Sequence, residues 1–423
     1  MFIGVKKTKK TDWAKVYYTD IWGTREAKFE ALARGNLVFS QLKIDQKMAY
    51  FIPFGSNDKE AYDKGVSVAE LFPVNVTGIV SGNDGASIAP TKAELIRRMD
   101  IVKNATEEKD IFDLWGRFSR GQTAEKIQND VLSGGAITPI SFRPFDSRWT
   151  YYSGNSCGWV LWPREKSTMG HLLAEPNSPI GANIGLVFCK TSRSFFSPFV
   201  SQNIIAHRLF SAMCEITYIA PLYLRSEPGL TGESWTANLD DEALNKLTQY
   251  LSKKPEPIEI FDYVYGVLHD PVYCEKYEQY LCRDFPRVPI INTPEKERDE
   301  GEFYVSEELY REYVSVGERL RKLHLMQIKA PAELALEPNT PDDMEIGAIK
   351  YKNGVLQLNA NKRITGISQE VWKYQIGGHQ VLDKWFKEHK GETLTIDSYT
   401  HIENVVGLLE ETIKLREYLR SLH

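Results

Sequence analysis

Few residues in this 423-residue chain combine the types and the spacing that catalysis requires. A metal-dependent nuclease of the PD…(D/E)xK kind needs clustered carboxylates and a lysine, which Asp342, Glu388 and Lys390 could supply. Their spacing is loose, and Asp342 lies in a turn-like stretch rich in proline and aspartate. The eight histidines show no metal-ligand spacing with the cysteines. These observations favour structural roles for the candidate nuclease residues.

Motifs for cofactor binding are also missing from the sequence. The chain contains no GxGxxG, no phosphate loop ending in GKS or GKT, and no HExxH. Gly181 and Gly185 lie four residues apart, a spacing too common to indicate a cofactor loop. The residues therefore give no direct sign of catalysis. A divergent DNA methyltransferase or nuclease with unrecognised motifs remains the alternative reading.

The distribution of charge along the chain is more informative about possible nucleic-acid binding than the net charge of −5. Between residues 137 and 225, eight lysines and arginines stand against four acidic residues, and the first 35 residues have the same excess. The rest of the chain is strongly acidic. The 137–225 segment is therefore the better candidate for contact with a polyanion.

Basic and hydroxyl side chains in this segment cluster at expected turns. Arg143 and Arg148 flank a Pro-Phe-Asp turn. An arginine at such a turn can make a bidentate contact with guanine or pair with a phosphate. Arg143 could instead pair with Asp146 and fix the turn. A polar cluster follows an expected strand, and such groups are typical of phosphate contacts. The predicted DNA contacts are Arg143, Arg148, Lys190, Thr191, Ser192, Arg193, Ser194, Asn203 and Arg208.

The elements that position these residues differ along the chain. Short aromatic and β-branched runs between residues 137 and 224, 158–162 among them, alternate with turn residues and predict a mainly β domain of five to seven strands. Aromatic residues in such strands are usually core, which favours a structural role over base stacking. The aromatic residues concerned are Tyr151, Tyr152, Trp159 and Trp162.

The two ends of the chain give different patterns. Near the start, residues 2–6 and 15–19 read as a strand hairpin followed by a helix over 24–33. After residue 226 helices dominate, with an acidic helix pair over 258–285 that indicates scaffold rather than a reading surface. Further helices are predicted over 306–325, 381–389 and 400–422, the last with a capping box of Thr400 and Glu403.

The composition bounds the cellular context. Five cysteines without a CxxC pair indicate reduced, mostly buried thiols. The longest apolar stretch, over 204–224, is interrupted by His207, Arg208 and Glu215, so no membrane span or membrane partner is expected. Because the N-terminus has apolar residues before its lysines, the reverse of a secretory signal, a cytoplasmic location is expected.

Five local phrases are distinctive, and they are VYYTDIWGTR from Val16, FRPFDSRWTYY from Phe142, IFDYVYGVLHDPVY from Ile260, DFPRVP from Asp284 and WKYQIGGHQVLDKW from Trp372. Together and in this order they resemble the C-terminal part of the single-polypeptide ATP-dependent restriction–modification enzymes (type ISP) and the related fused adenine methyltransferases. The resemblance extends from about Thr11 to about Thr395. The sequence departs from the family at His379, where the family usually has an aromatic residue, and at Glu388-His389, where it often has basic residues.

The resemblance implies a sequence-specific module that recognises duplex DNA and is not catalytic alone. In the family the cofactor loop and the Asn-Pro-Pro-Tyr-type motif lie upstream of this segment. S-adenosylmethionine is therefore expected on that upstream methyltransferase part, and no cofactor in this chain. The methyltransferase and nuclease segment of the parent enzyme is the expected protein partner.

The resemblance also implies an α+β fold in three parts. Residues 1–135 are expected to hold the C-terminal strands of a methyltransferase-like domain plus a connector, with a glycine-rich junction at 77–85. Residues 136–225 are expected to form the mainly β part of a target-recognition domain, and residues 226–423 its helical part.

Overall fold

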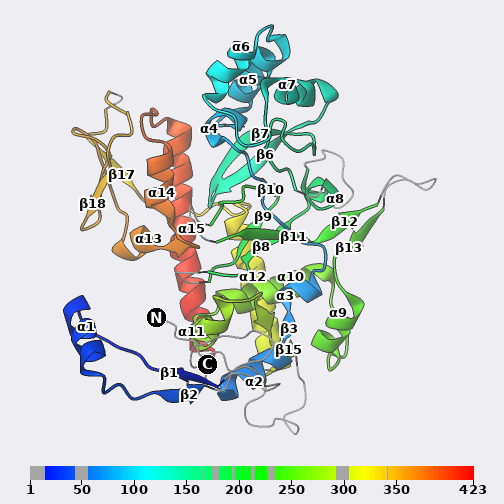
Figure 1. Ribbon diagram of the computed structural model, residues 1–423, viewed down its shortest axis with the longest axis vertical. Helices are drawn as coiled ribbons and strands as arrows, with labels where there is room; N and C mark the ends of the chain where they lie inside the picture. Colours follow the sequence, from blue (N-terminus) through cyan, green and yellow to red (C-terminus); the bar gives the residue numbers. More distant parts are fainter. Residues whose placement is uncertain are drawn as a thin grey trace. The chain divides into compact units, whose positions relative to one another are not determined.

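The structure is a computed structural model, and it describes residues 15–42, 56–164, 166–173, 181–192, 196–210, 215–226, 234–291, 304–340 and 342–423. The chain divides into two compact units, Met1–Ala61 and Tyr62–His423. Helix α2 (Ser56–Lys64) crosses that division. Figure 1 shows the elements of both units.

The first unit contains β1 (Val16–Tyr18), α1 (Arg25–Arg34) and β2 (Ser40–Leu42). Thr24 caps α1 by accepting a hydrogen bond from the backbone of Ala27, which confirms the predicted helix. Strand β1 pairs antiparallel with β2, and α1 lies between the two strands in the sequence. The predicted partner strand at residues 2–6 lies outside the described residues.

One sheet of the second unit has the order β10-β6-β7-β5. Its centre is the antiparallel hairpin of β6 (Ala136–Arg143) and β7 (Asp146–Tyr152), while β10 (Ile204–Ile205) runs parallel to β6. Edge strand β5 (Ile88–Ala89) pairs with β7. This sheet holds the start of the predicted recognition segment.

Three helices pack together beside this hairpin. Helix α5 (Lys92–Asn104) contacts β5 and β7, and α6 (Glu108–Trp115) and α7 (Ala124–Ser133) pack on α5. Figure 1 shows them as a cyan group next to β6 and β7. These helices form a packed layer, whose apolar residues Ile111, Trp115 and Ile127 are buried.

A second sheet has the order β4-β11-β8-β9. Strands β8 (Gly185–Cys189) and β9 (Phe199–Ser201) are buried along their whole length, as strands covered on both faces must be. β11 (Thr217–Pro221) joins them to β4 (Val76–Thr77). With β12 (Tyr223–Arg225), the described part of residues 136–225 contains seven strands, which confirms its mainly β character.

The run Gly158–Trp162, predicted to be a strand, makes only the isolated bridge between Val80 and Trp162. Its backbone is tied to helix α7 instead, because Asp130 accepts a hydrogen bond from the Trp159 amide at 2.7 Å. A Cβ at Gly158 would lie 2.3 Å from the Asp130 carboxylate, so only glycine fits there.

The helices after residue 226 follow the prediction closely. Asp270 caps α11 (Pro271–Leu281) directly after α10 (Pro257–His269). Helix α10 packs against α12 (Glu307–His324). Gly317 allows this contact, since a Cβ there would lie 1.9 Å from the Asp262 carbonyl oxygen. The predicted helix over 381–389 is α14 (Val381–Glu388).

Two features of the C-terminal part differ from the sequence prediction. The last helix, α15, spans Ile396–Ser421, and its capping box consists of Thr395 and Ser398 rather than Thr400 and Glu403. Thr400 lies inside the helix because an earlier Thr/Ser pair already caps it. A four-stranded antiparallel sheet was also missed; its order is β17 (Ala335–Glu337), β20 (Arg363–Thr365), β19 (Val355–Gln357) and β18 (Lys350–Lys352).

Short elements complete the described chain. The helices are α3 (Val68–Leu71), α4 (Asp84–Ser87), α8 (Lys166–Met169), the 3₁₀ turn Gly170–Leu172, α9 (Asp241–Thr248) and α13 (Gln369–Lys373). The strands are β3 (Val66–Ser67), β13 (Trp235–Ala237), β14 (Arg287–Val288), β15 (Ile290–Ile291), β16 (Tyr304–Val305), β21 (Gln375–Ile376) and β22 (His379–Gln380).

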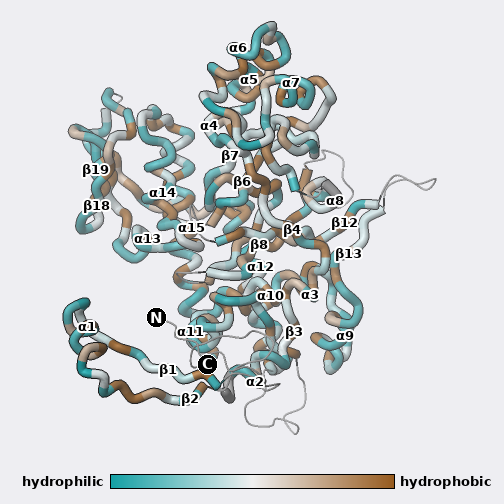
Figure 2. The backbone as a smooth tube through the Cα atoms, in the orientation of Figure 1, coloured by the Kyte–Doolittle hydropathy of each residue, from teal (hydrophilic) through white to brown (hydrophobic). Residues whose placement is uncertain are grey.

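One hydrophobic core runs through the second unit. It includes Leu95 of the helical layer, Ile140 of β6 and Val405 of α15, so all three predicted parts contribute to it. Figure 2 shows hydrophobic stretches along the central strands and hydrophilic ones on outer helices such as α9. The predicted boundaries near residues 135 and 225 stay predictions. Among the described residues no helix is long and apolar enough to cross a bilayer.

Candidate nucleic-acid interface

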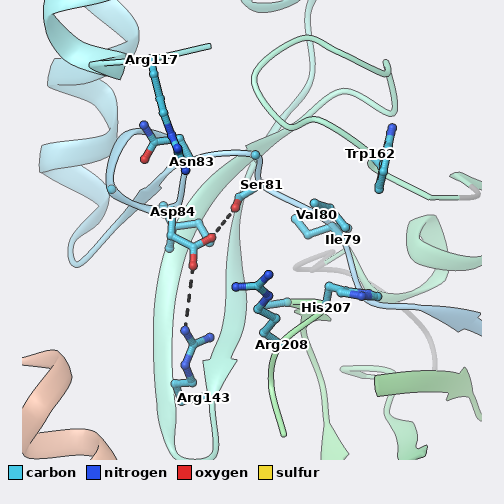
Figure 3. Close-up of a pocket in the computed structure, with 14 residues that line it drawn as sticks. Ile79, Val80, Ser81, Asn83, Asp84, Arg117, Arg143, Trp162, His207 and Arg208 are labelled. Atoms are coloured by element: carbon cyan, nitrogen blue, oxygen red, sulfur yellow. Dashed lines mark hydrogen bonds and ion pairs between the residues drawn. The ribbon is translucent and has the colours of Figure 1, made fainter. Parts of the chain in front are cut away.

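The glycine-rich segment at 77–85 lines a cavity of about 520 Å³, called cavity A below (Figure 3). Two neighbours hold this segment: Ile79 pairs with Ala206, and Val80 pairs with Trp162. A Cβ at Gly78 would lie 2.6 Å from the Ala206 carbonyl group, so the close approach needs glycine. The segment expected to be a junction is therefore one wall of a cavity.

Three arginines line cavity A from separate parts of the chain. Arg117 follows α6, Arg143 ends β6, and Arg208 follows β10 (Figure 3). Arg117 and Arg208 are exposed, and within the described parts of the chain neither has an ion pair or a side-chain hydrogen bond. Asp84 is the acidic residue of the lining, and it accepts a hydrogen bond from Ser81. The cavity therefore has excess positive charge.

Arg143 is buried, with its side chain only 8% exposed. Its Nη1 donates to the Phe142 carbonyl oxygen at 2.8 Å, its Nε lies 3.3 Å from Glu388 Oε1, and its Nη2 lies 3.9 Å from Asp84. Burial lowers the pKa of this guanidinium, against the opposing effects of Glu388 and Asp84. Arg143 thus joins the cavity wall to α14.

The ion pair expected between Arg143 and Asp146 forms with Arg148 instead. Arg148 contacts the Asp146 carboxylate through Nε at 3.1 Å and Nη2 at 3.0 Å. Residues two apart on a strand point to the same face, so Arg148 can reach Asp146 directly along β7. The Arg148 guanidinium is therefore occupied within the protein and lies outside cavity A.

The predicted polar loop after β8 lies against the end of α11. Lys190 Nζ is 3.9 Å from Asp284 and 5.2 Å from the centre of the Phe285 ring. The Ser192 amide donates to the Cys282 carbonyl oxygen, and Thr191 is exposed. Arg193 and Ser194 lie outside the described residues. As DNA contacts, the residues of this loop stay predictions.

Asn203 lies in the turn between β9 and β10 and lines a second cavity of about 620 Å³, called cavity B below. Arg143 lines both cavities, so they adjoin at this residue. The structure thus brings Arg143 and Arg208 together at cavity A and Arg143 and Asn203 at cavity B. It does not bring Arg148 or Lys190 to either cavity.

The aromatic residues divide as the sequence suggests. Tyr151, Tyr152 and Trp159 are buried, and Trp159 Nε1 donates to the Ser87 carbonyl oxygen. Trp162 is different, because half of its surface is exposed at the edge of cavity A. Three of the four aromatic residues are therefore core.

Sequence reasoning missed Arg117 and Gln202, which line cavities A and B respectively. Arg117 lies in the glycine-flanked basic stretch GRFSRG from Gly116, a signal that could have identified it. Gln202 precedes the candidate Asn203, and only the turn between β9 and β10 places it at a cavity.

One catalytic pattern also escaped the sequence search. Residues 154–158 read GNSCG, a match to GxSxG. A nucleophile elbow needs a strand, a sharp turn and a helix in succession. Here Ser156 lies in an exposed turn, and the Gly158 carbonyl oxygen accepts a hydrogen bond from Gln122. No helix follows this turn directly, so the elbow is not formed.

The candidate nuclease carboxylate Glu388 serves an ion-pair role. Lys384 Nζ lies 2.6 Å from its Oε1. Burial opposes ionisation, but Lys384 and Arg143 together lower the pKa of Glu388. In the described residues no group of three or more histidine, cysteine or acidic side chains could hold a metal ion.

The sequence itself identifies the family. Residues 70–417 match the family model of the type ISP C-terminal specificity domain. The chain therefore belongs to this family, which confirms the resemblance and the α+β class. Comparison with curated proteins gives no match.

Solved structures share the fold at low identity. ATP-dependent type ISP restriction–modification enzyme LlaBIII bound to DNA has a TM-score of 0.69 and 17% identity, over 98% of this chain and 28% of that one. A nuclease-deletion mutant of the type ISP enzyme LlaGI in complex with a DNA substrate mimic has a TM-score of 0.66 and 16% identity, over 97% of this chain and 33% of that one. The DrdV–DNA complex has a TM-score of 0.65 and 19% identity, over 96% of this chain and 43% of that one. The chain thus spans less than half the length of each.

Proposed function

We propose that this chain is the sequence-specific duplex-DNA recognition module of a restriction–modification enzyme. Methyl transfer, cleavage and S-adenosylmethionine binding would belong to other segments of the parent enzyme. The observation that carries the proposal is the pair Arg117 and Arg208 on one cavity, both exposed and both without an acidic partner in the described chain.

Some exposed arginines of this chain have a carboxylate partner. Arg363 pairs with Glu337, and Arg311 pairs with Glu307. Arg117 and Arg208 instead keep their guanidinium donors available toward one concave surface. Guanidinium groups match phosphate oxygens in charge and in fork geometry. A backbone phosphate of DNA fits this pair.

The comparisons support the same proposal. The family is described as a specificity domain, and the structures of LlaBIII, LlaGI and DrdV contain DNA or a DNA mimic. A recognition module needs phosphate contacts for position and base contacts for sequence. Cavity A supplies groups suited to the first task.

The experiment measures binding of the full chain to labelled duplex DNA over a range of salt concentration. Each lost phosphate contact should reduce the magnitude of the negative slope of log affinity against log salt by about 0.9. Arg117→Ala and Arg208→Ala should each weaken binding and flatten this slope. Arg363→Ala, which removes an exposed arginine paired with Glu337, is the matched control. Unchanged slopes in both cavity variants would contradict the proposal.

A further inference from the structure

Gln202 and Asn203 form the turn between β9 and β10, and both residues line cavity B and a smaller neighbouring cavity of about 200 Å³. Both residues are half-buried, yet in the described structure neither side-chain amide makes a hydrogen bond. Most other half-buried or buried amides in the described part of the chain make hydrogen bonds. Gln122 donates to the Gly158 carbonyl oxygen, and Asn238 donates to those of Val74 and Pro221.

The turn that carries these amides is held firmly. Ser201 Oγ donates to the Asn203 carbonyl oxygen at 2.9 Å and accepts from the Asn203 amide at 3.0 Å. Ser141 of β6 contacts the same hydroxyl at 2.8 Å. Because β9 and β10 belong to different sheets, the turn is fixed from both sides. Two uncommitted amide groups on a fixed turn form a preorganised hydrogen-bonding surface.

The charge around cavity B selects the kind of group that it can take. Its lining includes the carboxylates of Asp146, Glu392 and Asp397 and the guanidinium of Arg143, which is paired with Glu388. Asp146 is neutralised by Arg148, but Glu392 and Asp397 have no ion pair in the described chain. These acidic groups repel phosphate, whereas the edge of a neutral base carries no such penalty. Cavity B is therefore suited to a base rather than to the backbone.

The amide side chain has a preferred partner among the bases. Its carbonyl oxygen and NH₂ group match adenine N6 and N7 in the major groove, which is a bidentate contact. Cavity A, with its free arginines, adjoins cavity B at Arg143. A duplex whose backbone contacts Arg117 and Arg208 can therefore present its groove to the 202–203 turn.

We propose that Gln202 and Asn203 determine specificity by reading an adenine in the major groove of the DNA bound at cavity A. This inference rests on the proposed function. It names the base class read and the residues that read it.

The experiment begins with selection of the wild-type chain from a random duplex library, which gives its preferred sequence. Each adenine in that sequence is then replaced singly by 7-deazaadenine, which lacks only the N7 acceptor. One replacement should lower the affinity of the wild-type chain about tenfold, within the range for a bidentate base contact. The same replacement should have little effect on Asn203→Ala or on Gln202→Ala.

Two further variants keep the test independent of folding. Gln202→Glu and Asn203→Asp retain side-chain size but replace the NH₂ donor by an acceptor, so preference should move from adenine toward cytosine, whose N4 donates. Gln249→Ala, at an exposed position after α9, is the control and should keep the wild-type preference. Thermal melting confirms that each variant is folded.

The outcomes separate the two proposals. If the wild-type chain binds no duplex, the proposed function fails and the inference falls with it. If the wild-type chain binds with a preference that all four variants at 202 and 203 retain, only the reading role is overturned. If the variants lose the preference at one adenine but keep the salt slope, both proposals are supported.

Discussion

Arg143 and Glu388 lie far apart in the sequence, yet their Nε and Oε1 atoms are 3.3 Å apart. This contact ties the hairpin of β6 and β7 to the end of α14, at the place where cavities A and B adjoin. Both side chains are largely removed from solvent, with exposures of 8% and 21%. The pair therefore links the predicted recognition sheet to the C-terminal helices.

Removal of one charge from this pair should destabilise the fold. Glu388→Gln leaves the buried Arg143 with weaker compensation, so the free energy of unfolding should fall by about 1–3 kcal/mol. Chemical denaturation measures the change. The pair Arg363 and Glu337, whose side chains are 55% and 44% exposed, gives the control, because Glu337→Gln should change stability by less than about 1 kcal/mol. Equal effects of the two substitutions would show that burial of Arg143 is unimportant.

Lys190 should contribute less to DNA binding than Arg208 does. Its ammonium group already lies 3.9 Å from Asp284, whereas Arg208 has no acidic partner in the described chain. Lys190→Ala should therefore weaken binding and flatten the salt slope, but by less than Arg208→Ala. Measuring the DNA affinity of both variants over the same range of salt concentration shows which substitution has the larger effect. A larger effect at Lys190 would place the phosphate track on the loop after β8.

Leu268 tests whether the helix pair α10 and α11 is scaffold. It is fully buried, so Leu268→Ala should lower the free energy of unfolding by about 2–5 kcal/mol. The sequence preference of the folded fraction should stay as in the wild type. Denaturation and library selection give the two readouts. A changed preference in a folded variant would place the reading surface on this helix pair.

His324 should make stability depend on pH. Burial, with a smaller effect of Arg416, lowers its pKa from 6.5 to about 3. Its ring nitrogens contact the Tyr265 hydroxyl at 2.6 Å and the Thr412 hydroxyl at 3.0 Å. Between pH 6.5 and about 3, His324 therefore binds a proton in the unfolded chain but stays neutral in the folded chain. Stability falls as the pH drops through that window.

The measurement is the free energy of unfolding as a function of pH for the wild-type chain and for His324→Gln. The variant should lose up to about 1.4 kcal/mol per pH unit from the slope between pH 6 and pH 4. Leu268→Ala should be less stable but should keep the wild-type slope. Identical slopes in the wild-type chain and the His324 variant would mean that His324 does not titrate in this window.

The sequence by itself determined the local elements with strong signals. The pair Asp270-Pro271 marks both the end of α10 and the start of α11, because a capping side chain and a fixed φ act on neighbouring residues only. The phrases that resemble type ISP enzymes identified the family, which the match over 70–417 confirms. The density of aromatic and β-branched runs identified the mainly β segment.

Only the tertiary structure decided which charged groups are available. Arg143, Arg148 and Arg208 look alike in the sequence, but Glu388 neutralises the first and Asp146 the second, while the third faces a cavity. Arg117 joins that cavity from the segment between α6 and α7. The reason is physical: an arginine's availability depends on the carboxylates that long-range packing places around it, and local pattern does not encode those contacts.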